Sequence, residues 1–524
     1  MSRDSEQPSA FSRFKYTKQP HFSQEEAAAL PSTPSIAGRA ALAIALLIGF
    51  YVLAISIAVV LLLIPYEAYS NNVRLPGKLL VLCVAGAGII LWSILPRFDK
   101  FKPPGPQLTT QDQPELFEMV RSVSRATGET MPAEVYLIAD VNAWVAQRGG
   151  ILGVGSRRVM GLGLPLMQIL SVTQLRAVLA HEFGHYYGGD TRLGPLVYNM
   201  RGAIGRTVYN LARQNSILYK PFAWYGSGAL RLTQGVSRQQ EHAADELAAR
   251  TVGAKPLADA LRAIHSGAIA YVPYVQQEVV PLLGLQVRPA FAEGFAHFLA
   301  APRVEKAVVE ETEREIAQGK SDPYDSHPPL RERLAELANL TQGEIPEADA
   351  AAAALLRGLD SLEAELLTFI TGRSEIKSWR SVVWEKVGDE VYLPSWVKVA
   401  SKYQQGLQGV RPTDFPQIAA DLAAFGRRFS EKTELPSPDV LEQRASEATG
   451  AAFAKSLHEH GWTLRADPGE PFRFFRGAAQ IEPFSVLKKL SSGEISKEVW
   501  KQQCHETGIA DLDLGATNSP VSSN

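Results

Sequence analysis

The stretch AVLAHEFGHYYGGD, from Ala177 to Asp190, decides how this chain is interpreted. It places His181 and His185 four residues apart, with Glu182 directly after the first histidine. Residues four apart on a helix share a face, so the two imidazoles can reach one ion. Glu182 then projects beside that ion, where a carboxylate can accept a proton from water. The pattern favours a catalytic metal site, and the alternative is an amphipathic helix with two histidines that bind no metal.

The residues around this stretch predict that it lies in a helix. Ser171 is a good N-cap, and Gln174 three residues later completes a capping-box pattern. Gly188 and Gly189 are typical of a helix end. We therefore expect one helix of about 16 residues that carries both histidines in its second half.

A catalytic zinc site with two histidines needs a third protein ligand. Glu241, in the stretch EHAAD, is the best candidate, and Asp245 follows it by one helical turn on the same face. One carboxylate would bind the metal while the other orients a ligand histidine. His242 is the alternative ligand, and a solvated Ala/Glu helix is the alternative to any site. Asp190 is expected either to cap a loop or to support a ligand.

The stretch SHPPLRER contains a second pair of candidates. His327 precedes two prolines, which hold it on an extended entry to the following helix, and Arg333 lies within that helix. A positioned histidine and arginine near a metal would stabilise an oxyanion. The alternative is a helix boundary with a surface arginine.

Composition excludes several classes of protein. The chain has 524 residues, 46% of them hydrophobic, and a formal net charge of -2. A nucleic-acid-binding protein would usually show a basic excess, so we expect no nucleic-acid partner. The two cysteines, Cys83 and Cys504, exclude a disulfide framework and a cysteine-rich zinc finger.

Two uncharged apolar runs predict a membrane hairpin. They are ALAIALLIGFYVLAISIAVVLLLI (41–64) and LLVLCVAGAGIILWSIL (79–95), and Pro65 and Pro96 are expected to end them. A buried core helix is the alternative for the second run. Basic residues are modestly more frequent outside the hairpin than between its two runs, which favours both ends on the cytoplasmic side. The interval 192–240 has scattered basic residues and no third span, and is expected to lie on the membrane or to form a lid.

Local sequence patterns elsewhere predict short strands and several helices. Short apolar runs at 133–139, 143–149 and 157–163 are typical of a small sheet, and 460–467 and 472–479 are typical of a strand pair. Helices are expected at 114–128, 305–319 and 494–508, and one Ala/Leu-rich helix at 347–370.

Three motifs in order resemble the membrane zinc metallopeptidases of the HtpX and CAAX-prenyl-protease type. That family has HExxH, then ExxxD, then HPxxxxR, as found in AHEFGHYYGGD, EHAADELA and SHPPLRERLAEL. The stretch VNAWVAQ is similar to the family's Asn-Ala strand. The resemblance covers roughly residues 115–337.

The resemblance implies a fold, a cofactor and a set of site residues. The fold is mainly α with a small β-sheet, a thermolysin-like (gluzincin) peptidase domain, and one zinc ion is bound per chain. By position, it implies His181, His185 and Glu241 as metal ligands, Glu182 as general base, Asp245 as the partner of a ligand histidine, His327 and Arg333 as stabilising groups, and Asn142 and Ala143 as the strand that takes the substrate.

These inferences give the expected organisation and function. We expect a flexible tail (1–36), a transmembrane hairpin (37–100), a zinc metallopeptidase domain (101–345) and an α+β C-terminal region (346–524) that can bind a protein partner. The function is hydrolysis of protein or peptide substrates by an integral membrane protein, in the cell membrane if bacterial, for membrane-protein quality control or processing. The alternatives are an inactive zinc-binding membrane scaffold and a prenyl-protein processing protease.

Overall fold

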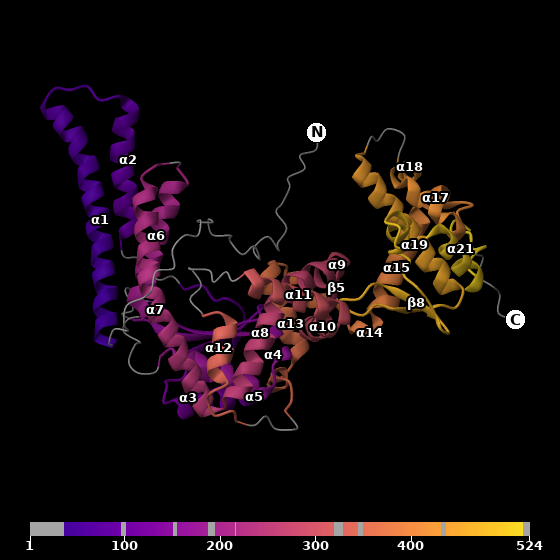
Figure 1. Cartoon of the computed structure of the whole chain (residues 1–524), viewed down its shortest axis with the longest axis horizontal. Coiled ribbons are helices and arrows are strands. Elements are labelled where there is room, and N and C mark those ends of the chain that lie inside the picture. Colours follow the sequence, from indigo (N-terminus) through magenta and orange to yellow (C-terminus); the bar gives the residue numbers. More distant parts are fainter. Residues whose placement is uncertain are drawn as a thin grey trace. The chain divides into compact units, whose positions relative to one another are not determined.

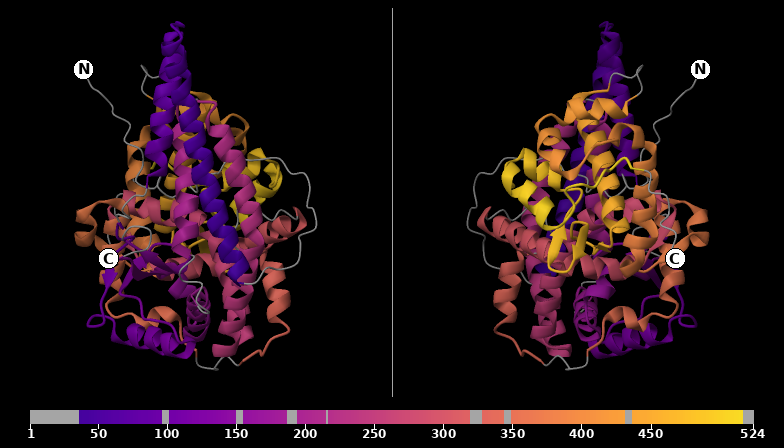
Figure 2. Two further views of the ribbon diagram at one scale, coloured as in Figure 1. Left: turned by 90° about the vertical axis from the view of Figure 1, so that its left-hand side faces the viewer. Right: turned by 90° about the vertical axis from the view of Figure 1, so that its right-hand side faces the viewer.

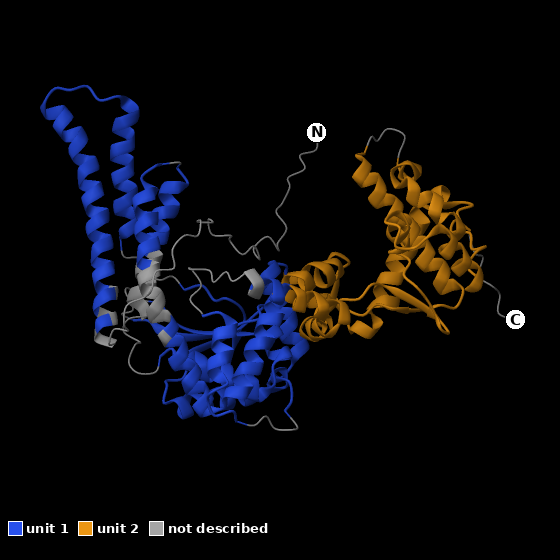
Figure 3. Cartoon of the chain, in the orientation of Figure 1, with its two compact units in different colours: residues 1–268, 311–373 blue, residues 269–310, 374–524 orange. Residues whose placement is uncertain are grey.

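The computed structural model describes residues 36–95, 101–149, 155–186, 194–214, 216–318, 328–343, 349–430 and 436–516. The expected tail lies almost wholly outside these residues. The chain forms two compact units, each assembled from two segments (Figure 3). Unit 1 contains residues 1–268 and 311–373, and unit 2 contains residues 269–310 and 374–524. The boundary expected between residues 345 and 346 stays a prediction.

The N-terminal apolar runs form two helices, α1 (Ile36–Ser70) and α2 (Gly77–Ile94), which pack side by side as a hairpin. Both are long and apolar enough to cross a membrane. Several large side chains on α1, such as Ile48, Val52 and Val60, are more than half exposed. A surface of this kind is costly in water and favourable in lipid.

The sequence prediction was wrong about Pro65, which lies inside α1 and does not end it. A proline removes one backbone N–H and with it one helical hydrogen bond. The helix continues for one further turn and ends at Ser70. Pro96 lies outside the described residues.

The interval after the metal-site helix forms two helices, α6 (Gly194–Ala212) and α7 (Tyr219–Thr251). α6 and the first part of α7 pack against α1 and α2 (Figure 1 and Figure 2). Their shared core includes Phe50, Ile90, Leu211 and Phe222. The interval therefore joins the hairpin as a second helix pair, with α7 extending from it into the site.

A four-stranded sheet supports the site in unit 1. Its strands are β1 (Gln107–Leu108), β2 (Glu134–Ile138), β3 (Ala143–Arg148) and β4 (Arg157–Gly163). The spatial order is β1-β2-β4-β3, with β2 parallel and β3 antiparallel to β4. The three apolar runs therefore form the predicted sheet, and β3 lies at its edge.

Short helices complete unit 1 around α5 (Val172–Gly184), which packs against α3, α7 and β3. The others are α3 (Pro114–Thr127), α4 (Leu164–Ile169), α12 (Leu330–Leu337), η4 (Ala352–Leu355) and α13 (Leu359–Thr371). The chain passes between the two units within α8 (Ala254–Tyr274) and α11 (Pro302–Gln318).

The single helix expected at 347–370 was wrong, because this stretch divides into η4 and α13. The Asp349 carboxylate accepts a hydrogen bond from the Thr173 backbone, and Ala351 forms a β-bridge with Ser171. Gly358 then adopts a positive φ of 66°, which an alanine-rich helix would not allow. Tertiary contacts with the start of α5 thus outweigh the helix propensity of alanine.

Unit 2 begins with η3 (Val275–Val279), α9 (Val280–Gly284), β5 (Val287–Pro289) and α10 (Phe291–Ala300). These elements pack with a segment that comes later in the sequence. It contains η5 (Ser374–Ser378), β6 (Arg380–Val382), α14 (Trp384–Val387) and η6 (Gly388–Tyr392). β5 pairs with β6, and the Trp384 indole donates to the Ala290 carbonyl at 2.8 Å. Tyr274, Phe291 and Phe295 fill the space between them.

The remainder of unit 2 is a helical assembly with a three-stranded sheet. Its helices are α15 (Leu393–Lys402), α16 (Gln404–Leu407), η7 (Pro412–Asp414), α17 (Phe415–Ala420), α18 (Leu422–Gly426), η8 (Arg427–Phe429), α19 (Pro438–Glu459), α20 (Val486–Ser491) and α21 (Lys497–Glu506). Its strands are β7 (Thr463–Arg465), β8 (Arg473–Arg476) and β9 (Ala479–Ile481). The predicted strand pair is thus confirmed, and the expected fold class, mainly helical with small sheets, is correct.

Candidate metal centre

The helix that carries the two histidines begins as the sequence predicts. The Gln174 backbone N–H donates to the Ser171 hydroxyl at 3.2 Å, and the Ser171 backbone N–H donates to the Gln174 side chain at 2.9 Å. This capping box satisfies two of the free donors at the helix start. α5 ends earlier than expected, at Gly184, so His185 follows its last helical residue. Gly188 and Gly189 lie outside the described residues.

Gly184 lets the second ligand-bearing helix come close. A Cβ atom at this position would lie 2.7 Å from the Ala244 Cα and 2.9 Å from its Cβ. Only a glycine therefore allows α7 to pack against α5 at this distance. This close approach places Glu241 of α7 opposite the two histidines. Asp245, next to Ala244, lies one turn after Glu241 on the same helix.

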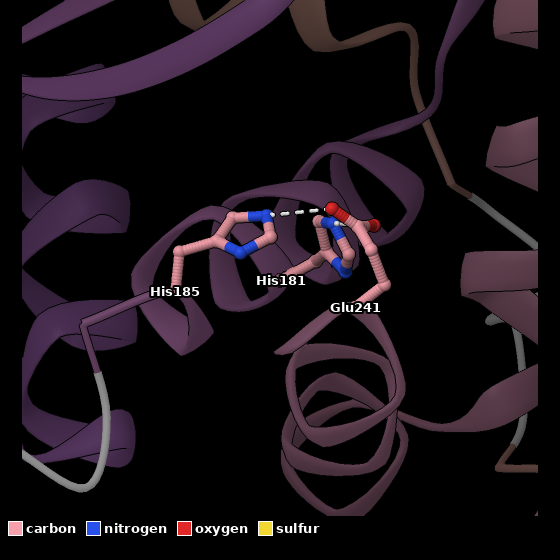
Figure 4. Close-up of side chains that lie close together, drawn as sticks. All are labelled: His181, His185 and Glu241. Atoms are coloured by element: carbon pink, nitrogen blue, oxygen red, sulfur yellow. Dashed lines mark ion pairs between the residues drawn. The ribbon is translucent and has the colours of Figure 1, made fainter. Parts of the chain in front are cut away.

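His181, His185 and Glu241 meet at one point (Figure 4). The His181 Nε2 atom lies 3.5 Å from one Glu241 oxygen, and the His185 Nε2 atom lies 3.6 Å from the other. Ligands about 2.1 Å from a zinc ion at tetrahedral corners lie about 3.4 Å from one another. The spacing of the three side chains therefore suits a small divalent metal.

A second layer of buried residues orients the first histidine. The His181 Nδ1 atom lies 2.9 Å from an Asp245 oxygen, which leaves Nε2 directed toward Glu241. Arg333, on α12, contacts both Asp245 oxygens, with Nε at 2.9 Å and an outer nitrogen at 2.6 Å. The same arginine lies 3.3 Å from the His181 ring and 3.7 Å from Glu241. Its donors are thus directed at these side chains.

The charge of this layer also favours a bound cation. Glu241, Asp245 and Arg333 are 3%, 4% and 6% exposed. Two carboxylates and one guanidinium give these three buried residues a net charge of −1, and burial of net charge is costly. A divalent cation between Glu241 and the histidines would offset it, so the donor set fits a metal in chemistry as well as in spacing.

The ionisation of the layer follows from its contacts. Burial raises the pKa of Asp245, but hydrogen bonds from His181 and Arg333 outweigh it and hold the pKa at about 2. Burial lowers the pKa of Arg333, and its bonds to Asp245 outweigh this and raise it. Asp245 and Arg333 therefore stay charged, and Asp245 remains an acceptor for His181 across the neutral range.

Glu182 lies beside this layer and outside the metal-binding group. It is partly exposed, and its carboxylate contributes to the raised pKa of Arg333. Burial raises the pKa of Tyr186 to about 12, and Glu182 adds to that rise. The Glu182 charge therefore contributes to the raised pKa of both Arg333 and Tyr186.

Other candidates of the sequence analysis lie elsewhere or outside the description. His242, the alternative ligand, forms an ion pair with Glu336 on α12 and is no part of the three-residue group. Asp190 and His327 lie outside the described residues. Asn142 is exposed and precedes β3, and its carbonyl accepts from the Gly163 N–H at 2.9 Å. Ala143 begins β3 and is only 3% exposed.

One residue near the site has no prediction from the sequence. Tyr186 directly follows His185, and its hydroxyl donates to the Val145 carbonyl on β3 at 2.8 Å. The Arg158 guanidinium lies 4.4 Å from the centre of its ring. A tyrosine after HExxH gives no local signal for such contacts, because both partners lie on strands distant in the sequence.

Comparison with known proteins identifies the part of the chain that carries the site. Residues 110–341 match the model of Peptidase family M48. A protease HtpX homologue of Sulfurihydrogenibium sp. (strain YO3AOP1) is 26% identical over 256 residues, which cover 45% of this chain and 77% of the relative. Another, of Gemmatimonas aurantiaca (strain DSM 14586 / JCM 11422 / NBRC 100505 / T-27), is 28% identical over 252 residues, which cover 44% of this chain and 78% of the relative.

A third protease HtpX homologue, of Arthrobacter sp. (strain FB24), is 24% identical over 254 residues, which cover 45% of this chain and 75% of the relative. No solved structure matches the chain. The matched region contains the three-residue group and its supporting residues, and two helices apolar enough for a membrane precede it. Residues 110–341 are therefore a metallopeptidase domain similar to family M48 and to proteases of the HtpX type, in a chain whose two apolar helices support membrane association.

Proposed function

We propose that the protein is a zinc endopeptidase anchored by the α1–α2 hairpin, which acts in the quality control or processing of membrane proteins. The observation that carries this proposal is the group of His181, His185 and Glu241, with ligand atoms within 4.8 Å of one another and Glu182 beside it. Two imidazoles and one carboxylate leave a fourth tetrahedral position for water or substrate.

The proposed reaction is hydrolysis of a peptide bond. When bound, the zinc ion supplies polarisation of the scissile carbonyl and a lower pKa for water. Glu182 takes a proton from the attacking water and returns it to the leaving nitrogen. His327 is our candidate for stabilising the oxyanion. For Arg333 we propose positioning, since its donors face Asp245 and the His181 ring.

The anchoring and orientation are part of the same proposal. Basic residues in the N-terminal tail and after α2 favour both ends of the hairpin on the cytoplasmic side, and with them the peptidase domain. A protein partner bound through the C-terminal region remains a further proposal. An inactive scaffold is less favoured, because a structural zinc site normally uses four protein ligands. Among the described residues, the group contains three.

Replacing Glu182 with glutamine tests the proposed function. The Glu182→Gln protein should keep its metal and lose about 100- to 10,000-fold in the rate of peptide hydrolysis, because the proton acceptor is absent. Glu246→Gln, which removes a carboxylate on the exposed side of α7, is the matched control and should hydrolyse like the parent. Hydrolysis by Glu182→Gln at the parental rate would contradict the proposal. Expressed in membranes, the same variant should retain substrates, which identifies their class.

A further inference from the structure

The edge strand of the sheet presents main-chain groups beside the metal centre. In the antiparallel pairing of β3 with β4, Asn142 opposes Gly163 and bonds to it. Such pairs alternate along the ladder, so the backbone groups of Trp144 and Ala146 also face β4. Those of Ala143, Val145 and Gln147 face the other way. In the part of the chain that the structure describes, no strand pairs with this side of β3.

Tyr186 bonds to one of these outward-facing residues, Val145. Its hydroxyl donates to the Val145 carbonyl at 2.8 Å. The Gln147 backbone also acts on the same hydroxyl, whose pKa it lowers against the larger rise from burial. One phenol group thus takes the place that one residue of an added strand would occupy.

The tyrosine is held firmly in this position. The Arg158 guanidinium lies against its ring, 4.4 Å from the centroid. Arg158 is itself fixed by Glu129 at 3.1 Å and by the Thr130 carbonyl at 2.8 Å. Tyr186 is therefore anchored through both its ring and its hydroxyl, as expected for a permanent part of the edge.

We propose that Tyr186 ends the stretch of β3 with which a peptide substrate can pair. The inference rests on the proposed function, in which an extended peptide adds to this edge. On the N-terminal side of the Val145 carbonyl, to which Tyr186 bonds, the backbone N–H and C=O of Ala143 and the N–H of Val145 remain for pairing with a peptide. Ala143 is 3% exposed, so a peptide that pairs with it must displace the groups that cover it. A peptide that paired further would also have to displace the tyrosine hydroxyl.

The substrate class that follows is a peptide recognised through a short extended segment. Pairing through a few main-chain groups recognises an extended peptide backbone and depends little on the side chains of the peptide. Residues of the substrate beyond the Val145 N–H then add no affinity. The protein should accept segments of many sequences, provided that a few residues on one side of the scissile bond are extended.

The test compares peptide binding by two full-length proteins in detergent. Both carry Glu182→Gln to prevent cleavage, and one also carries Tyr186→Phe. Fluorescence polarisation gives the Kd of a labelled peptide and of versions extended by two residues at either end. Without Tyr186→Phe, extension on the side that pairs with β3 should leave the Kd unchanged. With it, the Kd for one of the two extensions should fall about 3- to 10-fold, because the Val145 carbonyl becomes available.

Two controls separate the outcomes. Tyr136→Phe removes a hydroxyl from β2, where it bonds to Glu134, and should not create a dependence on length. Methylation of the added backbone amides should abolish the gain seen with Tyr186→Phe. Equal weakening of short and extended peptides, or no dependence on length in either protein, overturns the inference. Failure of the proposed function is distinct, since it is seen as absent metal-dependent hydrolysis by the parent.

Discussion

At the scale of single residues, the site depends on an aspartate that binds no metal. Asp245 accepts from His181 and pairs with Arg333, so one carboxylate fixes the orientation of a ligand and the position of a buried cation. Neither role requires contact with substrate. Partners of this kind orient ligand histidines and raise metal affinity in other metal sites.

Asp245→Asn should therefore weaken metal binding by about 10- to 100-fold. The amide cannot balance the charge of Arg333, which is 6% exposed, and it holds the His181 ring less firmly. Competition with a chromophoric chelator measures the affinity. Glu246→Gln, one residue along α7, is the control and should bind metal like the parent. Unchanged affinity in Asp245→Asn would show that the first three side chains suffice.

The candidate site was largely predictable at this scale, and its limits have a physical cause. His181, Glu182 and His185 follow from spacing along one helix, and Glu241 with Asp245 from spacing along another. The part of Arg333 in the second layer did not follow, because only the folded chain brings α12 to α7. Tyr186 escaped prediction for the same reason, since its partners lie on β3 and β4.

At the scale of elements, the distance between α5 and α7 sets the geometry of the site. His181 and His185 come from one helix and Glu241 from the other, so a change in their separation moves the ligands apart. At Gly184 of α5, an added Cβ atom would come within 2.7 Å of the Ala244 Cα on α7. The separation of the helices therefore depends on a missing side chain.

Gly184→Ala should both destabilise the protein and weaken metal binding. Its methyl group would lie 2.7 Å from the Ala244 Cα, so the helices must separate, at a cost of about 1–3 kcal/mol. Thermal unfolding and chelator competition measure the two effects. Gly228→Ala, also on a packed helix of unit 1 but with no atom within 4 Å of the added carbon, should be neutral or slightly stabilising. Equal behaviour of the two variants would exclude the proposed crowding.

Local signals predicted the hairpin, the sheet and the metal-site helix, and long-range contacts explain several elements that were missed. The capping box of α5 and the apolar runs of β2, β3 and β4 depend on neighbours in the sequence. The packing of α6 and α7 against α1 and α2 does not. It includes an Asn210 amide that donates to the Ser93 hydroxyl at 3.0 Å and a Tyr225 hydroxyl that donates to the Leu46 carbonyl at 2.6 Å. No sequence pattern within residues 192–240 predicts these contacts with α1 and α2.

At the scale of the whole molecule, neither compact unit is a continuous piece of chain. Unit 2 contains residues 269–310, which lie between α7 and α12 in the sequence. Unit 1 in turn contains residues 349–373, where Asp349 bonds to the start of α5 and the Arg357 backbone bonds to Gln113. Sequence reasoning follows the chain in order and could not anticipate this exchange of segments.

A chain that stops after residue 345 should therefore fold poorly. It lacks β6 and Trp384, so Tyr274, Phe291 and Phe295 lose the side chains that cover them, and α5 loses the Asp349 cap. We expect rapid digestion in limited proteolysis and low yield from membranes. A chain that stops after residue 516, the last described, is the control and should resist digestion like the parent. A stable, metal-binding protein of residues 1–345 would contradict this prediction.

Because each unit contains two separate segments of the chain, the two segments of unit 2 are synthesised at different times. The ribosome releases residues 269–310 before it makes the segment from residue 374 onward that covers them. Translation proceeds at about 5–20 residues per second, so synthesis from residue 310 to residue 374 takes about 3 to 13 seconds. During this time the hydrophobic side chains of residues 269–310 stay uncovered. By the time residue 373 emerges, the helices that bear His181, Glu241 and Arg333 have all been synthesised. Metal can thus be acquired before translation ends, and the bound ion would then brace the first unit while the second is still being made.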